Sequence, residues 1–501
     1  MHTQSRPTSR QLDTDRLRIV IRWGESGPRP WESEIARRLR AVQGAEVIET
    51  PAHAPCGSAD IVLDTSETPL HAAARAPAAD HPSLGYWCFV YGDEGRLSDP
   101  CTAELAAGRR SALIQLVSID ANGQATLLEG GAIKTVPHSL RATRERMFDA
   151  VVSWPERALT RILEQPHRQI RGPSVPWTPA PPVPARFVAL GGYARRIAQE
   201  MVEEHWAIGI IPRPVTHVLH SFDASEIQWL QPPEGHAIAD PLGVVEREGT
   251  LTLLAESFDF DDRQGRIVAL EVRDGKVLSP PREVLRRPVH LSYPHLIAHG
   301  AHLYCLPEAA GAGCVQLFRA ERFPDCWVPD RILLQNFAAA DATVYRWEGR
   351  WWMFVCNHAD QDETKLYVFH AQDLFGRWHP HARNPVKCDL RSARPAGPLF
   401  EHEGALYRPA QDCSVTYGGA VAVNRVLTLS PTDFAEETVT VLRPLASGPY
   451  PHGLHTLTGA GAYTVVDGKR HSRSLRRLAW GLRQLARGLR THADRPRQPA
   501  P

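Results

Sequence analysis

The first 170 residues alternate between short apolar runs and longer segments with helical spacing. Trp31–Val42 and Leu140–Glu164 repeat apolar residues every three or four positions, which is typical of helices that cover a sheet. Four apolar runs have the length of buried strands: Leu17–Trp23, Ala59–Thr65, Gly85–Asp93 and Ser111–Ile119. This alternation predicts a doubly wound α/β domain over residues 1–171.

A proline-rich run, GPSVPWTPAPPVP, covers residues 172–184. Prolines at this density favour extended backbone without regular hydrogen bonds, so we expect a semi-stiff linker here. The chain after this run has a different pattern, and we expect a second domain to begin at residue 185.

The second domain repeats with a period of about fifty residues. Five polar or aromatic positions are separated by 53, 48, 53 and 58 residues, and we call them the repeat positions: Asp240, Tyr293, Asp341, Arg394 and His452. Each precedes an apolar strand, a turn with glycine and a second apolar strand. Short strands at this period predict an all-β five-bladed propeller over residues 185–468. A β-sandwich is the alternative, but it does not produce a constant period. Val215–Phe222 could supply the outer strand that closes the ring.

A propeller would bring these distant residues together, because the inner strands of all blades begin at one rim. A second set follows each of the first four repeat positions by about fifteen residues, at the end of the next strand: Glu256, Glu308, Asn357 and Arg408. Antiparallel neighbours run in opposite directions, so this set can return to the same rim. His290, Gln411, Asp412 and Tyr417 lie nearby in the sequence.

Carboxylates mixed with arginines and aromatic rings suit a polyhydroxylated ligand. We predict that Asp240 is a base or nucleophile, that Glu308 is the acid, and that Asp341 tunes a pKa or accepts a sugar hydroxyl. The predicted substrate-binding residues are Glu256, His290, Tyr293, Asn357, Arg394, Arg408, Gln411, Asp412, Tyr417 and His452. Purely structural roles remain open, with Glu256 and Glu308 in salt bridges between blades and the arginines as clamps of the sheet. No metal or cofactor is expected.

Three resemblances add to these expectations. Gly85–Asp93 and the following stretch, SALIQLVSIDANGQATLLEGG, weakly resemble a formyltransferase domain, with Tyr86-Trp87-Cys88 where that family has an Asn-x-His element. IADPLGVV around Asp240 resembles the first blade of arabinanase, β-xylosidase and invertase propellers. ADPLGVV, HLSYPHL, LFRAERFPDCW and LYRPAQDCSVTYGG, between residues 239 and 419, resemble the N-terminal region of glucosamine inositolphosphorylceramide transferases more specifically. These resemblances imply a degenerate formyltransferase fold and a propeller linked to carbohydrate or glycolipid.

The functional expectation therefore has two forms. The first is a protein that cleaves or transfers a glycosyl unit of a glycan or glycolipid by carboxylate acid–base chemistry. The second is a saccharide-binding or scaffold protein in which two enzyme folds have lost their activity. The net charge of +1 gives no reason to expect a nucleic-acid partner.

The C-terminal segment is strongly basic. Residues 469–490 contain eight lysines and arginines and no acidic residue, and five leucines spaced three or four positions apart would share one helical face. Such a helix could lie on an anionic membrane surface or pack against protein. No apolar signal segment is seen at the N-terminus. We therefore expect a cytoplasmic protein, peripheral at the inner membrane face in the first alternative, with a disordered tail within residues 469–501.

Overall fold

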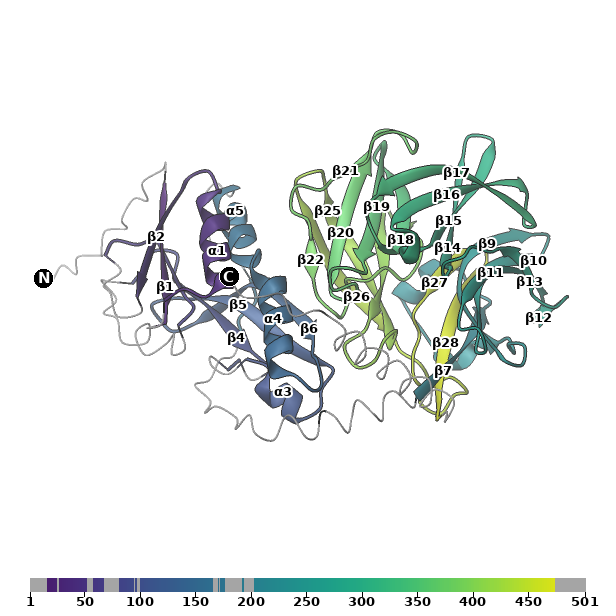
Figure 1. The fold of residues 1–501 in the computed structure, drawn as a ribbon, viewed down its shortest axis with the longest axis horizontal. Coiled ribbons are helices and arrows are strands. Elements are labelled where there is room, and N and C mark those ends of the chain that lie inside the picture. The colour runs from purple at the N-terminus through teal and green to yellow at the C-terminus, as the bar shows by residue number, and fades with distance from the viewer. Residues whose placement is uncertain are drawn as a thin grey trace, which may run out of the picture. The chain divides into compact units, whose positions relative to one another are not determined.

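The structure is a computed structural model that describes residues 16–24, 27–51, 57–66, 81–93, 95–96, 100–164, 170, 172–175, 192 and 202–473. The chain forms two compact units, a smaller one from the N-terminal part and a larger one that contains residues 202–473 (Figure 1).

The N-terminal unit is built on a six-stranded mixed sheet with the order β2-β1-β3-β4-β5-β6. The first four strands in this order pair in parallel, whereas β4 and β5 are antiparallel. The parallel pairing expected of a doubly wound domain is therefore limited to part of the sheet. The strands are β1 (Leu17–Trp23), β2 (Ala45–Pro51), β3 (Ile61–Asp64), β4 (Tyr86–Tyr91), β5 (Ser111–Ile119) and β6 (Ala125–Lys134).

Helices α1 (Pro30–Arg40) and α5 (Trp154–Glu164) lie side by side (Figure 1). Helix α4 (Leu140–Val151) precedes α5 in the chain, and the short α3 (Thr102–Ala106) precedes β5. Trp31 of α1 stacks on Phe148 of α4, with ring centroids 4.3 Å apart. The single helix predicted for residues 140–164 is wrong. Pro155 has no amide hydrogen and fits only the first turn of a helix, so α4 ends and α5 begins just before it.

The start of the proline-rich run is not a linker. Leu127 donates its amide to Pro173 and Val175 donates its amide to Ala125, so residues 172–175 run along β6. The apolar Val175 is buried against the sheet, which explains why this end of the run is ordered. The remaining residues of the predicted linker, 176–184, lie outside the described residues.

The second unit contains five antiparallel sheets in succession, as the repeat predicts. The first sheet has β9 (His236–Arg247), β10 (Thr250–Asp259), β11 (Gly265–Arg273), β12 (Lys276–Val277) and β13 (Arg282–Leu285). The second has β14 (Ser292–His299), β15 (His302–Glu308), β16 (Cys314–Arg322) and β17 (Cys326–Gln335). The third has β18 (Ala339–Trp347), β19 (Arg350–Asn357), β20 (Lys365–Ala371), β21 (His379–Pro380) and β22 (Lys387–Cys388). The fourth has β23 (Phe400–His402), β24 (Ala405–Asp412), β25 (Ala420–Leu429) and β26 (Phe434–Leu442).

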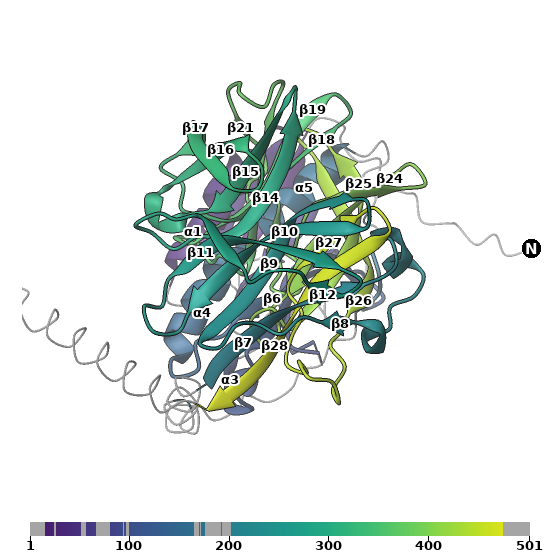
Figure 2. The same ribbon diagram turned by 90° about the vertical axis from the view of Figure 1, so that its right-hand side faces the viewer.

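The fifth sheet closes the ring. It joins β27 (Leu457–Ala460) and β28 (Tyr463–Arg473) to β7 (Val202–Ile211) and β8 (Gln228–Trp229), which come from the start of the unit. Figures 1 and 2 show yellow β28 beside teal β7. The all-β five-bladed propeller is therefore confirmed. The predicted closing segment is wrong, because Val215–Leu219 forms a 3-10 helix and β7 closes the ring instead.

The predicted basic helix also begins too early. Residues 469–473 belong to β28 and pair with β7, and Lys469 is fully buried. Residues 474–501, which carry the rest of that prediction, lie outside the described residues. No helix among the described residues is long and apolar enough to cross a membrane.

The first three inner strands share one irregularity. Asp240 in β9, Tyr293 in β14 and Asp341 in β18 have φ of 51°, 47° and 53°, in the left-handed region. At each of these residues the pairing with the next strand shifts register, which marks a bulge. A non-glycine residue held in this region is strained, and such strain gathers at functional sites. The bulges redirect the side chains at the first three repeat positions.

Candidate functional site

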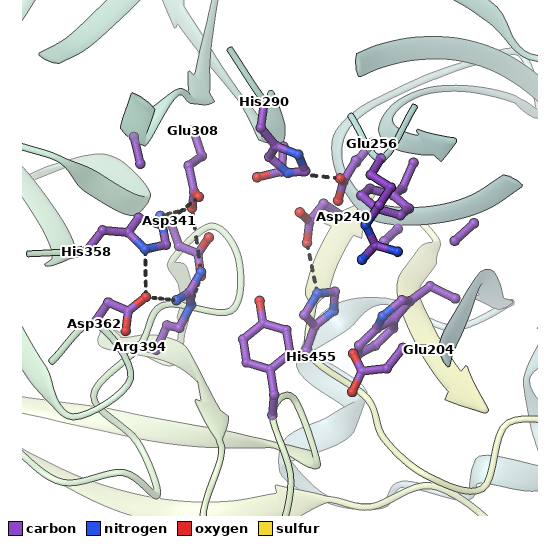
Figure 3. A pocket seen from close by; sticks show the side chains of 18 of the residues that line it. Glu204, Asp240, Glu256, His290, Glu308, Asp341, His358, Asp362, Arg394 and His455 are labelled. Atoms are coloured by element: carbon purple, nitrogen blue, oxygen red, sulfur yellow. Dashed lines mark hydrogen bonds and ion pairs between the residues drawn. The ribbon is translucent and has the colours of Figure 1, made fainter. Parts of the chain in front are cut away.

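The propeller unit contains a cavity of about 560 Å³. Charged and aromatic residues from all five blades line it, with Arg394 and Tyr417 of the fourth blade lying outside its strands, and Figure 3 shows side chains facing a common space. The convergence that the repeat predicts is therefore seen in the structure. The lining residues form two groups on opposite sides, one around Asp240 and one around Arg394.

Asp240 is hydrogen-bonded to the blades on both sides of its own. Its own amide donates to Asp467 Oδ2 at 3.0 Å, and the Tyr293 amide donates to Asp240 Oδ2 at 3.1 Å. The other oxygen, Oδ1, has no hydrogen-bond partner among the described residues although the residue is only 4% exposed. Burial raises the pKa of Asp240 to about 7, and neighbouring carboxylates add to the rise while His455 opposes it.

His455 lies between two aspartates. Its Nδ1 is 2.6 Å from Asp467 Oδ2 and its Nε2 is 3.4 Å from Asp240 Oδ1. Burial alone would lower the pKa of His455, but the two carboxylates outweigh it and raise the pKa to about 9. The ring also stacks on Trp206, with centroids 3.9 Å apart.

These three side chains place possible metal-ligand atoms within 4.8 Å of one another. A histidine binds a metal through the lone pair of a neutral ring nitrogen. Here both nitrogens of His455 face carboxylate oxygens, and the ring is an imidazolium at neutral pH. In the described geometry the set forms a carboxylate–imidazolium–carboxylate triad.

Arg394 organises the opposite side of the cavity (Figure 3). Its Nε donates to Asp341 Oδ2 at 2.6 Å and its Nη1 donates to Asp362 Oδ2 at 3.0 Å. Gln411 adds a second donor to Asp341 Oδ2 at 2.8 Å. The guanidinium also lies 5.3 Å from the centre of the Tyr417 ring. Burial raises the pKa of Asp341 well above its usual value, although Arg394 opposes the rise.

Glu308 is fixed as an anion in this group. Its Oε2 accepts the Asp341 amide at 2.9 Å and its Oε1 is 3.0 Å from His358 Nε2. Burial would raise its pKa, but the hydrogen bond from His358 and the charge of Arg394 lower the pKa of Glu308 to about 2. His358 also pairs with Asp362 at 2.8 Å, and these two hydrogen bonds raise the pKa of His358 to about 10.

Glu256 and His290, which lie on the same side of the cavity as Asp240, form a hydrogen-bonded pair. His290 Nε2 lies 3.1 Å from Glu256 Oε1, and the Gly265 amide donates to His290 Nδ1 at 3.0 Å. A nitrogen that accepts a hydrogen bond carries no proton, so the Gly265 amide favours the tautomer that is protonated on Nε2. Burial opposes the rise, but Glu256 and the other nearby carboxylates raise the pKa of His290. A side chain at Gly265 would collide with both partners, because a Cβ there would lie 2.3 Å from Glu256 Oε1.

Aromatic side chains complete the wall: Trp206, Phe258, Phe260 and Tyr417. One side of Trp206 is covered by His455, and the buried Lys469 ammonium lies 5.1 Å from its ring centroid. Little of the Trp206 face therefore remains for a ligand. The phenylalanines and Tyr417 are better placed to cover the apolar side of a sugar ring.

The structure brings most of the predicted site residues together. Asp240, Glu256, His290, Glu308, Asp341, Arg394 and Tyr417 line the cavity. Tyr293 and Gln411 do not line it, but they hydrogen-bond to Asp240 and Asp341.

Four predicted binding residues lie elsewhere. Arg408 is fully buried inside the fourth blade, where its Nη2 and Nε donate to the two carboxylate oxygens of Glu436 at 2.6 and 2.8 Å. Asn357 and Asp412 cap turns by accepting the amides of Ala359 and Ser414. His452 stacks on His471, away from the cavity lining.

Sequence reasoning missed His358, Asp362, His455, Asp467 and Trp206. His358 and Asp362 lie in the loop after β19, directly after the predicted Asn357, so the motif NHADQD was a usable signal. His455 stands three residues beyond the predicted His452, because the inner strand of the last blade starts only at Leu457. Trp206 belongs to β7, which was not assigned to the ring.

Comparison with known proteins places the likeness in the propeller. Residues 231–446 match the family described as glucosamine inositolphosphorylceramide transferase 1, N-terminal. Proteins named Glucosamine inositolphosphorylceramide transferase 1 from Oryza sativa subsp. japonica and Arabidopsis thaliana are each 31% identical over 208 residues. The match covers 40% of this chain and 28% and 27% of theirs, so this chain spans less than a third of these relatives.

Solved glycoside hydrolases also resemble the chain distantly. A family 117 enzyme from Zobellia galactanivorans is 10% identical with a TM-score of 0.35, over 54% of this chain and 91% of that one. The catalytic domain of a Coprinopsis cinerea GH62 α-L-arabinofuranosidase is 10% identical with a TM-score of 0.33, over 47% and 92%. At these scores the likeness carries no argument about function. The resemblance that the sequence shows between residues 239 and 419 is thus confirmed: this part of the chain is similar to the N-terminal region of glucosamine inositolphosphorylceramide transferases.

Proposed function

We propose that the propeller cavity binds a saccharide and that Asp240 transfers a proton at its glycosidic bond. The observation that carries this proposal is the state of Asp240, which is buried and has a pKa of about 7, and whose Oδ1 faces His455 Nε2 at 3.4 Å without a hydrogen-bond partner among the described residues. A carboxyl that titrates near neutrality can act as acid or base at the pH of the cell. Such groups are enriched at functional sites.

The second carboxyl of the reaction is Asp341 rather than Glu308. An acid must hold a proton before it can donate one, and Glu308 is kept ionised by His358 and Arg394. Burial raises the pKa of Asp341 well above its usual value, against the effect of Arg394, whose Nε donates to Asp341 Oδ2 at 2.6 Å. Glu308 then acts as a fixed acceptor that holds the Asp341 amide.

The composition of the wall supports a sugar-like ligand. Carboxylates accept hydrogen bonds from hydroxyl or amine groups, and Phe258, Phe260 and Tyr417 offer aromatic surface. The relatives carry names that pair glucosamine with inositolphosphorylceramide. We therefore propose a glycan or glycolipid that contains an amino sugar as the ligand. Chromatography of the reaction products distinguishes transfer of the glycosyl unit to water from transfer to another acceptor.

The decisive experiment compares Asp240→Asn with wild type on aryl glycosides and glucosamine conjugates. The variant should lose turnover by a factor of about 10² to 10⁴ and still bind the saccharide, as observed by saturation-transfer NMR. Asp274→Asn is a matched control, because Asp274 also has positive φ in the first blade but is exposed. Equal turnover in Asp240→Asn and wild type would refute the assigned role.

The alternative is a saccharide-binding protein without turnover. The ion pairs of Glu308 favour this alternative, because His358 and Arg394 keep the carboxylate that was predicted to be the acid in its ionised form. Under this alternative wild type shows no turnover on any glycoside of the panel, while binding persists in wild type and Asp240→Asn alike.

For the N-terminal unit we propose a degenerate formyltransferase-like domain. Trp87 and Cys88 are buried inside β4, so these positions present no polar group comparable to an Asn-x-His element. Wild type should accordingly fail to bind folate in a titration. The cytoplasmic location and the membrane contact of the basic segment remain predictions, tested by fractionation and by sedimentation with anionic vesicles.

A further inference from the structure

His455 reaches Asp240 from the last blade of the ring. The two residues are separated by 215 positions in the sequence, and Figure 3 shows the imidazole directed at the Asp240 carboxylate. The contact joins His455 Nε2 to Asp240 Oδ1 at 3.4 Å, and this oxygen has no hydrogen-bond partner among the described residues. His455 is therefore the cation that faces the reactive oxygen.

Asp467 holds the other end of the ring. Its Oδ2 lies 2.6 Å from His455 Nδ1, and its Oδ1 accepts the amides of His455 and Thr456 at 3.0 Å each. Asp467 Oδ2 also accepts the Asp240 amide. One fully buried carboxylate thus fixes both the imidazole and the backbone of the residue that the imidazole faces.

The plane of the imidazole is fixed by packing. Trp206 stacks on it, and Tyr417 meets it edge-on with centroids 5.7 Å apart. Gly418 leaves room for this packing, because a Cβ there would lie 2.6 Å from His455 Cβ and 3.0 Å from Trp206 Cη2. The ring has little freedom to turn away from Asp240.

We propose, on the basis of the proposed function, that His455 is a positioning residue for Asp240: clamped by Asp467 and Trp206, it orients the Asp240 carboxylate and stabilises its ionised form. The arrangement follows the logic of catalytic triads, in which a buried carboxylate orients an imidazole that in turn serves the reacting group. Here the imidazolium acts electrostatically on a carboxylate and does not itself touch the substrate bond.

Burial and the neighbouring carboxylates work against ionisation of Asp240. Glu256, Asp467 and Glu308 each raise the pKa of Asp240, and the charge of His455 opposes them. Asp467 and Asp240, with a smaller contribution from Asp341, keep His455 charged. Removing the imidazolium should therefore leave Asp240 among like charges, and its proton should become harder to remove.

The experiment measures the titration of Asp240 in the full chain by NMR of ¹³C-labelled aspartate carboxyls. The Asp240 signal is assigned by its loss in Asp240→Asn. In His455→Gln we expect its midpoint to move upward by at least one pH unit. His452→Gln is the matched control, because His452 lies three residues away, outside the cavity lining, and this change should leave the midpoint in place.

A second measurement needs no substitution at the site. In ¹⁵N spectra of wild type at pH 7.5, both ring nitrogens of His455 should carry a proton. Burial lowers the pKa of His452, so only one of its two ring nitrogens should carry a proton at this pH. An unmoved Asp240 midpoint in His455→Gln, or a neutral His455 at pH 7.5, would overturn the proposal.

Neither readout requires a ligand. A failure here would leave saccharide binding by the cavity untouched, and a failure to bind saccharides would leave these titrations unchanged.

Discussion

The backbone amide of Tyr293 donates a 3.1 Å hydrogen bond to Asp240 Oδ2, across the boundary between the first and second blades. The same relationship recurs around the ring. The Asp240 amide donates to Asp467 of the fifth blade, and the Asp341 amide donates to Glu308 of the second. Each strained bulge thus gives its amide to a carboxylate of the preceding blade. The side chain of Tyr293 has no carboxylate that could accept the amide of Asp341 in the third blade. Glu308, on the next strand of the second blade, accepts this amide instead.

Tyr293→Phe should destabilise the propeller measurably. The hydroxyl is buried and lies 2.7 Å from Thr343 Oγ1, so its removal costs about 1 kcal/mol in the free energy of unfolding. Tyr345→Phe is the control, because the Tyr345 hydroxyl meets Glu401 at the surface and its loss should cost less than half as much. Urea denaturation of both variants gives the comparison. Equal losses would show that the contact between Tyr293 and Thr343 has no special weight.

The stability of the protein should fall as the pH rises from 6.5 to 9. The pKa of His455 is about 9 in the folded chain and about 6.5 in the unfolded chain, so folding takes up a proton in this window. The stabilisation is complete below pH 6.5 and is lost as the pH passes through 9. The difference corresponds to about 3 kcal/mol. His358, whose pKa is also raised, contributes with the same sign.

Thermal or urea unfolding at several pH values tests this slope. His455→Gln should flatten the decline between pH 6.5 and 9, whereas His452→Gln should retain it. A wild type whose stability rises over this window would contradict the assigned charge of His455.

The repeat made much of this site predictable. Its period identifies Asp240, Tyr293 and Asp341 because the first three blades use the same bulge at the same place, and closure of the ring brings these residues together. The period does not tell which way a side chain points. Arg408 fits the second set by spacing, yet it turns into its own blade to reach Glu436.

Other residues carried no periodic signal at all. His358 and Asp362 lie in a loop, where no alternation of apolar and polar positions constrains them. Trp206 lies in β7, which comes from the start of the unit's sequence and pairs with β28 from its end. In the N-terminal unit β6 was missed because its glycines and polar residues, ATLLEGGAIK, hide the strand pattern.

Arg408→Met should destabilise the fourth blade without changing the cavity. It leaves the buried Glu436 with Lys387 as its remaining cation, at 2.7 Å, and breaking such a pair costs about 3 to 5 kcal/mol. The double variant Arg408→Met, Glu436→Met removes both charges and should recover much of this loss. Chemical denaturation gives the free energy of unfolding of wild type and of the single and double variants for this comparison. If the double variant is no more stable than Arg408→Met, the buried pair is not the cause.

Gly418→Ala should disturb the site more than its size suggests. Gly418 has φ of 54°, and an added Cβ would lie 2.6 Å from His455 Cβ, so both backbone strain and a collision result. We expect a loss of stability of about 1 to 3 kcal/mol, as is typical of strained backbone. The displaced imidazole should also lose its ring-current contact with Trp206. Gly404→Ala is the matched control, since Gly404 also has positive φ but has open space around its Cα. Backbone strain affects both variants, so a shift of the His455 ring signals in Gly418→Ala that is absent from Gly404→Ala isolates the collision. Unchanged His455 signals in Gly418→Ala would show that the imidazole is not held by this packing.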